Sequence, residues 1–369
     1  MPLRFREGLA GALAATAVAA SAPAIAHAAP LAGVDDCPQI TLLTIEHHEG
    51  GHLPAMECTR DAAGTVLLTA EDTWSVPLPP PGMQVTQSAV GTEGHTEFIV
   101  RRTASGAIEV LFVDTSDGHA DHPPADRHEA DHPHADHAHH EHEASTDAVD
   151  SGAPGPYQGG APDRCTDARW SSLGHFVYGP HVWFYNGAGA PLNVAATGLE
   201  AFTSSFDNVA AGRDGCHVES TTVLTSQVFA GETTVPPGIT PSRTCQPYDG
   251  LNVAGWVRGG SGYLGLACIY SYVDAGYGPR VLDADITLNA NYTWSTGPDF
   301  SASQYDVASV VAHEVGHVFG LGHAGSSAAP SQLTMSGSGV YPTSIYARYL
   351  GAGDREGLSA RYGSMGVDR

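Results

Sequence analysis

The stretch "AHEVGHVFGLGHAG", residues 312–325, places three histidines and one glutamate at fixed spacings. On an α-helix, residues four positions apart lie on one face about 6 Å apart along the axis, so His313 and His317 can bind one ion. Glu314 is rotated from His313 by about 100° and can reach a water molecule bound to that ion. The stretch therefore predicts a helix that carries two metal ligands and an acid–base group.

The same stretch indicates how a third histidine reaches the ion. On a continuous helix, His323 would be turned about 240° away from His317 and could not bind. Gly320 lies between them, and glycine readily adopts the left-handed conformation that ends helices. We therefore expect the chain to turn at Gly320 and to bring His323 back to the ion. Three neutral imidazoles leave zinc an open position for water, as catalytic zinc sites require.

The residues around this pattern resemble one protein family. The spacing H-E-x-x-H-x-x-G-x-x-H is similar to that of the metzincin zinc metalloproteases, and its surroundings most resemble matrixins and their bacterial relatives. "QLTMSGSG" (332–339) places Met335 after His323, as in the methionine turn of that family. "DADITLN" (283–289) resembles the strand that borders the family's substrate cleft, and "YLGAGDREGLSARYG" (349–363) resembles its closing helix.

The resemblance covers residues 165–369 and implies both a fold and an activity. The fold would be α+β, with a twisted, mostly parallel sheet and three helices that include the zinc helix. The activity would be that of an endopeptidase, which hydrolyses protein or peptide substrates with Glu314 as general base toward a zinc-activated water. The implied ligands of one catalytic Zn²⁺ are His313, His317 and His323, and the implied structural supports are Gly320 and Met335.

Two departures from the family affect what the resemblance implies. The histidine- and aspartate-rich loop that holds a structural zinc and calcium in animal matrixins is not found in this sequence, which leaves a requirement for Ca²⁺ open. The family's propeptide usually holds an inhibitory cysteine in the context "PRCG". "PDRCTD" (162–167) is similar, but it lies where the mature domain should begin, so we interpret Cys165 as a disulfide partner.

Composition divides the chain into four segments. Residues 1–28 have two early arginines, an alanine-rich apolar stretch and a small-residue cleavage pattern, which predicts a signal peptide and a secreted, extracellular protein. Residues 29–114 hold short apolar runs between Gly, Pro and polar clusters, as in a small β-rich domain. Residues 115–162 are rich in His and Asp and poor in bulky apolar residues, which predicts a disordered linker. Residues 163–369 form the predicted matrixin-like peptidase domain.

Hydrophobic periodicity places elements within the predicted peptidase domain. Helices are expected at 191–212, where apolar residues recur at three- and four-residue steps beginning with Leu192, at 305–320, and from Asp354 onward. Strand-like runs lie at 181–186, 220–226, 251–257, 264–273 and 281–289. Strands mixed with three helices favour an α+β domain.

Two roles are open for the N-terminal domain. As a propeptide it would cover the cleft until the linker was cut. As an accessory domain it would stay attached and bind a partner. Processing near residues 145–165 would favour the first role, and full activity of an intact secreted chain would favour the second.

Charge and cysteine content narrow the compartment and the partners. The formal net charge of −24 argues against binding to nucleic acid or to an anionic membrane surface, because both need clustered positive charge. The six cysteines fit an oxidising compartment, with one disulfide expected in the N-terminal part and two in the C-terminal part. The four downstream cysteines allow three pairings, which the sequence does not distinguish. It does not give the oligomeric state either.

A rival function uses a different part of the chain. The histidine-rich linker could make the protein an extracellular zinc-binding or zinc-storage protein with a catalytically inactive metzincin-like domain. That alternative leaves Glu314 unexplained, because storage needs no general base. A third alternative, an inhibitor or adhesion module, would be built on residues 29–114.

Overall fold

The computed structural model describes part of the chain. The described residues are 56–57, 65–69, 73–91, 95–112, 163–216, 225–273, 278–298, 300–325, 331–337, 340, 342 and 344–363. The expected signal peptide, the histidine-rich linker, Cys37 and Cys58 lie outside them. Among the residues that are described, no helix has the length and apolar character needed to cross a bilayer.

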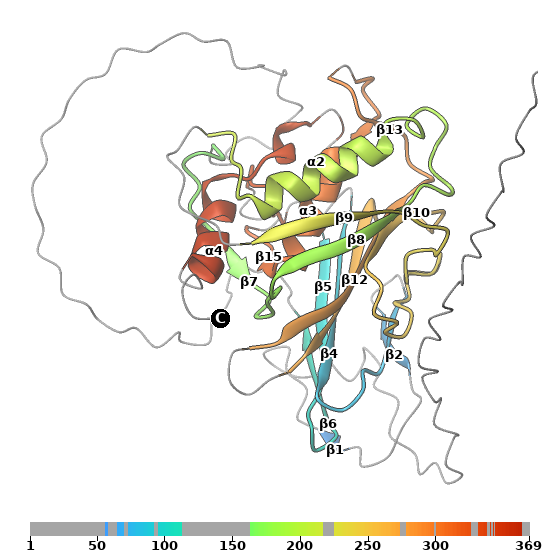
Figure 1. Cartoon of the computed structure of the whole chain (residues 1–369), viewed down its shortest axis with the longest axis vertical. Helices are drawn as coiled ribbons and strands as arrows, with labels where there is room; N and C mark the ends of the chain where they lie inside the picture. The colour runs from blue at the N-terminus through green and yellow to red at the C-terminus, as the bar shows by residue number, and fades with distance from the viewer. Residues whose placement is uncertain are drawn as a thin grey trace, which may run out of the picture. The chain divides into compact units, whose positions relative to one another are not determined.

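A nine-stranded mixed sheet forms the centre of this structure (Figure 1). From one edge to the other, its strands are β1 (Met56–Glu57), β6 (Ala107–Phe112), β5 (His95–Arg102), β4 (Met83–Val90), β11 (Gly265–Tyr272), β12 (Arg280–Asn289), β10 (Val253–Val257), β8 (Pro180–Asn186) and β9 (Ser226–Glu232). The strands from β12 to β9 pair in parallel, as expected for the downstream part. Every pairing from β12 to β1 is antiparallel, so the whole sheet is mixed and not mostly parallel.

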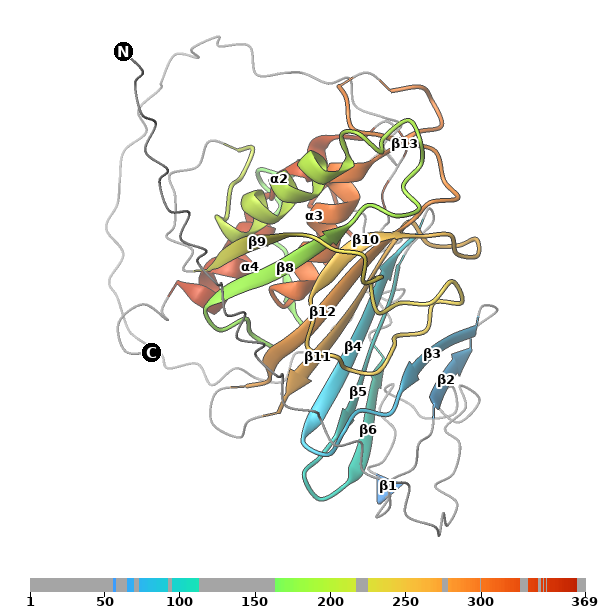
Figure 2. The same ribbon diagram turned by 45° about the vertical axis from the view of Figure 1, so that its right-hand side comes forward.

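The N-terminal strands extend the downstream sheet. Strand β4 lies beside β11 (Figure 2). All eight residues of β4 pair with β11, in the register from Met83 opposite Tyr272 to Val90 opposite Gly265. Over the described range, β4, β5 and β6 therefore share one sheet with the predicted peptidase domain. The expected domain boundaries at 114 and 162 fall among residues outside the description and stay predictions.

Three α-helices occur in the described part: α2 (Gly198–Ala210), α3 (Val307–Val318) and α4 (Ala352–Tyr362). Helix α2 was expected to start near residue 191, but residues 191–197 form turns in which Val194 donates to the Pro191 carbonyl. These turns change the direction of the chain, so Leu192 is 97% exposed and does not belong to the apolar stripe.

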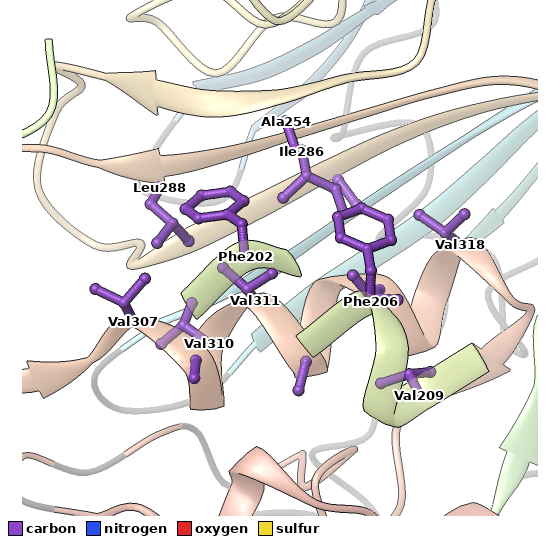
Figure 3. Packing of buried hydrophobic residues seen from close by; sticks show 14 of the residues in the cluster. Phe202, Phe206, Val209, Ala254, Ile286, Leu288, Val307, Val310, Val311 and Val318 are labelled. Carbon is purple, nitrogen blue, oxygen red and sulfur yellow. The ribbon is translucent and has the colours of Figure 1, made fainter. Parts of the chain in front are cut away.

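The main core lies between these helices and one face of the sheet. Figure 3 shows Phe202 and Phe206 of α2 and Val311 of α3 directed toward β12, the strand that carries Ile286 and Leu288. In the strands, alternate residues point to this core. In the helices, apolar residues spaced three or four positions apart form the face that packs on it. A second cluster of buried residues joins the N-terminal strands to β11 and includes Val85, Phe98, Val100, Leu266 and Tyr270.

Two sequence expectations about strands are tested only in part. "DADITLN" lies in β12, which has β11 on one side and β10 on the other, and its expected place at the border of a substrate cleft stays a prediction. Most of the strand expected at 220–226 lies outside the described residues, and the described strand β9 begins at Ser226. At the sheet edge β9 alternates between exposed and half-buried residues, so its apolar signal is weak.

The remaining elements are short. They are β2 (Thr65–Thr69) with β3 (Thr73–Pro77), β7 (Ser171–Ser172) with β15 (Leu321–Gly322), β13 (Trp294–Ser295) with β14 (Tyr305–Asp306), and a 3₁₀ turn, η1 (Tyr346–Arg348). Two disulfides join Cys165 to Cys216 and Cys245 to Cys268, which selects one of the three open pairings. Cys165 is therefore a disulfide partner, as expected.

Candidate metal centre

Helix α3 is buried along its whole length. It starts at Asp306, whose carboxylate accepts hydrogen bonds from the backbone N–H and the hydroxyl of Ser309 and pairs with Arg348 at 2.7 Å. Most of its residues are Val and Ala, as a helix enclosed by other elements requires. His313, Glu314 and His317 are fully buried in this apolar helix, so each must find a compensating partner.

The three histidines of the sequence pattern meet at one point. Gly320 follows the helix with a φ of 83°, a left-handed conformation in which the chain reverses into β15. This turn brings Nε2 of His323 to 3.0 Å from Nε2 of His313, which itself lies 3.1 Å from Nε2 of His317. In the part of the chain that is described, these three form a group whose ligand atoms could share one metal ion.

Hydrogen bonds to backbone carbonyls fix the tautomers of His313 and His317. Nδ1 of His313 lies 2.7 Å from the Thr334 carbonyl, and Nδ1 of His317 lies 2.9 Å from the Leu321 carbonyl. A carbonyl can only accept, so each Nδ1 carries the hydrogen and each Nε2 presents a lone pair. Two lone pairs that face each other at this distance repel unless a cation lies between them. The donor set therefore fits zinc, which binds neutral imidazole nitrogens held in this way.

The third ligand has a different outer partner. Nδ1 of His323 lies 2.6 Å from Oε2 of Glu97, a fully buried residue of β5. Burial raises the pKa of Glu97 to about 8. A bound dication would favour the ionised carboxylate, to which the His323 Nδ1–H can donate.

Burial also keeps the three rings neutral. It lowers the pKa of His313 to about 4 and lowers the pKa values of His317 and His323 well below the usual value. Neighbouring histidines add to this lowering for all three. Neutral imidazole is the form that binds metal, so the electrostatics of the site agree with its geometry.

Glu314 lies beside the three histidines, against strand β11. Its carboxylate faces the backbone N–H of Val90, which lowers its pKa, but burial dominates and raises that pKa well above the usual value. A Cβ atom on Gly265 would lie 2.6 Å from Oε1 of Glu314. Glycine at this position of β11 therefore leaves the space that the carboxylate occupies.

Met335 lies beneath the helix. A Cβ atom on Gly316 would lie 2.2 Å from its Sδ, so the methionine packs directly on the helix backbone between the ligands. Asp354 holds this turn, because its carboxylate accepts the backbone N–H groups of Thr334 at 2.8 Å and of Met335 at 3.2 Å. Burial raises the pKa of Asp354 to about 6. Sequence reasoning treated Asp354 as a helix start and missed this contact.

His95 and Glu97 are the site residues that sequence reasoning missed entirely. The His95 ring centroid lies 3.6 Å from that of His323, and its Nδ1 lies 2.5 Å from the Gly337 carbonyl. Both residues lie on β5, more than two hundred positions from the metal ligands. The one available signal was their spacing of two, which puts both side chains on the same face of a strand.

Comparison with known families agrees with this geometry. Residues 271–362 match the family model of the matrixins. The match includes the three histidines, Glu314 and Met335, and it confirms the resemblance to a matrixin-like metzincin family, which is a family of zinc metallopeptidases. Strands β8 to β10 and most of β11 lie before the matched range. None of the curated proteins compared with the chain matches it.

Proposed function

We propose that this chain is a secreted zinc endopeptidase that hydrolyses peptide bonds in protein or peptide substrates. One observation carries the proposal: three Nε2 atoms converge while two outer Nδ1–H groups are held by backbone carbonyls, and Glu314 lies alongside. When bound, zinc supplies a Lewis acid that polarises the scissile carbonyl and makes water a better nucleophile. His313, His317 and His323 would hold it.

Glu314 would act as the general base. Its carboxylate is one position along the helix from a ligand, so it can accept the proton of the attacking water and later pass it to the leaving amine. Burial disfavours the charged form of Glu314, and that form would be favoured again with a dication held by the three histidines. Met335 and Gly320 would support the ligands and would not contact substrate.

Secretion is part of the proposal. It is supported by the signal-peptide pattern of residues 1–28 and by the two disulfides in the described part, because disulfides persist in oxidising compartments. Mass measurement of the protein purified from culture medium would test it, with a mature chain that begins at Ala29 as the expected result.

The activity is tested with a full chain that carries a sequence-specific protease site within residues 118–143. After cutting, hydrolysis of a denatured protein is compared with that of the Glu314→Ala variant and of Glu356→Ala, which removes an exposed carboxylate on α4. We expect Glu314→Ala to reduce the rate about 10²–10⁴-fold with zinc retained, and Glu356→Ala to leave it unchanged.

The same experiment separates the peptidase from zinc storage. A chelator should stop hydrolysis, and added zinc should restore it. If the cut chain holds one zinc but hydrolyses no substrate, the peptidase proposal is wrong. Several zinc ions per chain, lost on deletion of residues 118–143, would then favour storage by the histidine-rich linker.

A further inference from the structure

The edge of β11 that faces away from β12 is paired with β4. Without β4, this strand would present a row of unpaired backbone N–H and C=O groups, to which an extended peptide can add as a further strand. In the structure β4 occupies that edge along its whole length, from Met83 to Val90. The hydrogen bonds from Val273 N to Gly82 O and from Leu264 N to Val90 O, 2.7 Å each, close the two ends of the pairing.

Strand β4 ends at Val90, beside Glu314. Val90 is fully buried, and its backbone N–H faces the Glu314 carboxylate. Glu314 itself has no exposed surface, and neither do His313 and His317. A general base must come within hydrogen-bond distance of the water that it deprotonates. In the arrangement seen here, a substrate and its attacking water cannot reach Glu314.

Strand β5, which follows β4 in the chain, contacts His323 with two side chains. His95 stacks on the ring of His323 and is anchored to the Gly337 carbonyl. Glu97 contacts the outer nitrogen of the same ligand. Both groups therefore contact His323 from β5, the strand that pairs with β4.

An apolar cluster keeps β4 and β5 in place on β11. Val85, Phe98 and Val100 are fully buried together with Leu266 of β11. Removing such apolar side chains from water stabilises the pairing of the strands. The strands are thus fixed to β11 by an apolar cluster as well as by backbone pairing.

We propose that β4 and β5, here called the cover strands, are a built-in inhibitor that occupies the substrate cleft of this chain in the manner of an extended peptide. The inference rests on the proposed peptidase function and assigns residues 83–102 to a propeptide and not to an accessory domain. The cover strands block the site with backbone pairing and with His95, and Cys165 takes no part because it is held in a disulfide.

The test compares the intact chain with the chain cut within residues 118–143, both loaded with zinc and assayed at nanomolar concentration on a short peptide. A tethered segment acts at an effective concentration in the millimolar range, so we expect the intact chain to be at least about 100-fold slower than the cut chain. Amide hydrogen exchange of Leu266–Tyr272 should become faster after cutting, because β11 loses its partner.

A variant tests the same point without cutting. Ser88→Pro removes a backbone N–H from the middle of β4, opposite Ala267, and should raise the activity of the intact chain. Glu109→Pro introduces the same residue into β6, which pairs with β5 and β1 but not with β11, and should raise it far less. Adding Glu314→Ala to Ser88→Pro should abolish the gain.

The outcomes distinguish the two proposals. If the intact and cut chains are equally active and β11 exchanges equally in both, the inhibitor is ruled out while the peptidase stands. If the cut chain and Ser88→Pro bind zinc and hydrolyse nothing, the peptidase function fails, and the inhibitor with it. If Ser88→Pro does not fold, the intact-versus-cut comparison still decides.

Discussion

The proposed metal ligands and the cover strands meet at one centre but are built in opposite ways. The ligands come from a single stretch, His313 to His323, and two of them find their outer partners in nearby backbone carbonyls. The cover strands reach the same centre from β4 and β5 through side chains and sheet pairing. The difference teaches that the chemistry is local in this chain, whereas access to it depends on distant contacts.

The largest effect should follow from breaking the ligand set. His317→Ala removes one of three convergent Nε2 atoms, and we expect loss of tightly bound zinc and of all chelator-sensitive hydrolysis. Metal content and activity of the cut chain would be measured together. His181→Ala is the matched control, because His181 is buried against Phe206 and lies outside the group of three. Zinc retained by His317→Ala would contradict the ligand assignment.

A second prediction concerns the support beneath the ligands. The pKa of Asp354 is raised by burial from 3.8 to about 6, so folding disfavours its charged form. Protonated Asp354 therefore contributes fully to the free energy of unfolding below about pH 4. This contribution, about 3 kcal/mol at most, is lost as pH rises through 6.

Denaturant unfolding of the chain and of Asp354→Asn at several pH values would measure this contribution. The free energy of unfolding of the parent should fall relative to that of the variant between about pH 4 and pH 6. Glu356→Gln, on the exposed side of the same helix, should run parallel to the parent. An equal pH dependence for Asp354→Asn would show that burial does not raise this pKa.

A third prediction tests the contact between β11 and helix α3. In Gly265→Ala, the new methyl group would overlap Glu314 and displace its carboxylate. Misplacement of a catalytic group by about 1 Å can cost about 10²-fold in rate, so we expect a loss of that order with zinc retained. A Cβ atom on Gly260 would meet only Nη2 of Arg243 at 3.8 Å, an ordinary contact, so Gly260→Ala serves as control. Unchanged kcat in Gly265→Ala would show that Glu314 has room to move.

The smallest effect should come from a single side chain of the cover strands, Glu97. Glu97→Ala removes the acceptor beside Nδ1 of His323, and loss of such a partner typically weakens metal binding about 10–100-fold. Zinc affinity of the intact chain would be measured by competition with a chelator. Glu109→Ala breaks a partly exposed pair with Arg101 on the neighbouring strand and should change the zinc affinity little. Equal affinities in the two variants would mean that Glu97 does not support the ligand.

The amino-acid sequence by itself determined the candidate metal centre. His313, His317 and Glu314 are placed by helix periodicity, and Gly320 redirects the chain because a left-handed residue is easy for glycine. The same local rules located the zinc helix and most strands, and failed at residues 191–197, where turns override an apolar repeat.

Only the tertiary structure decided which strands cover the three histidines. The pairing of β4 with β11, the placement of Glu97 beside His323 and the clamp of Asp354 on the Met335 turn join residues that are far apart in sequence. No periodicity encodes such contacts, since an open strand edge accepts any extended partner with suitable side chains. Burial against Leu266 and Tyr270 selects the partner, and that choice exists only in the folded chain.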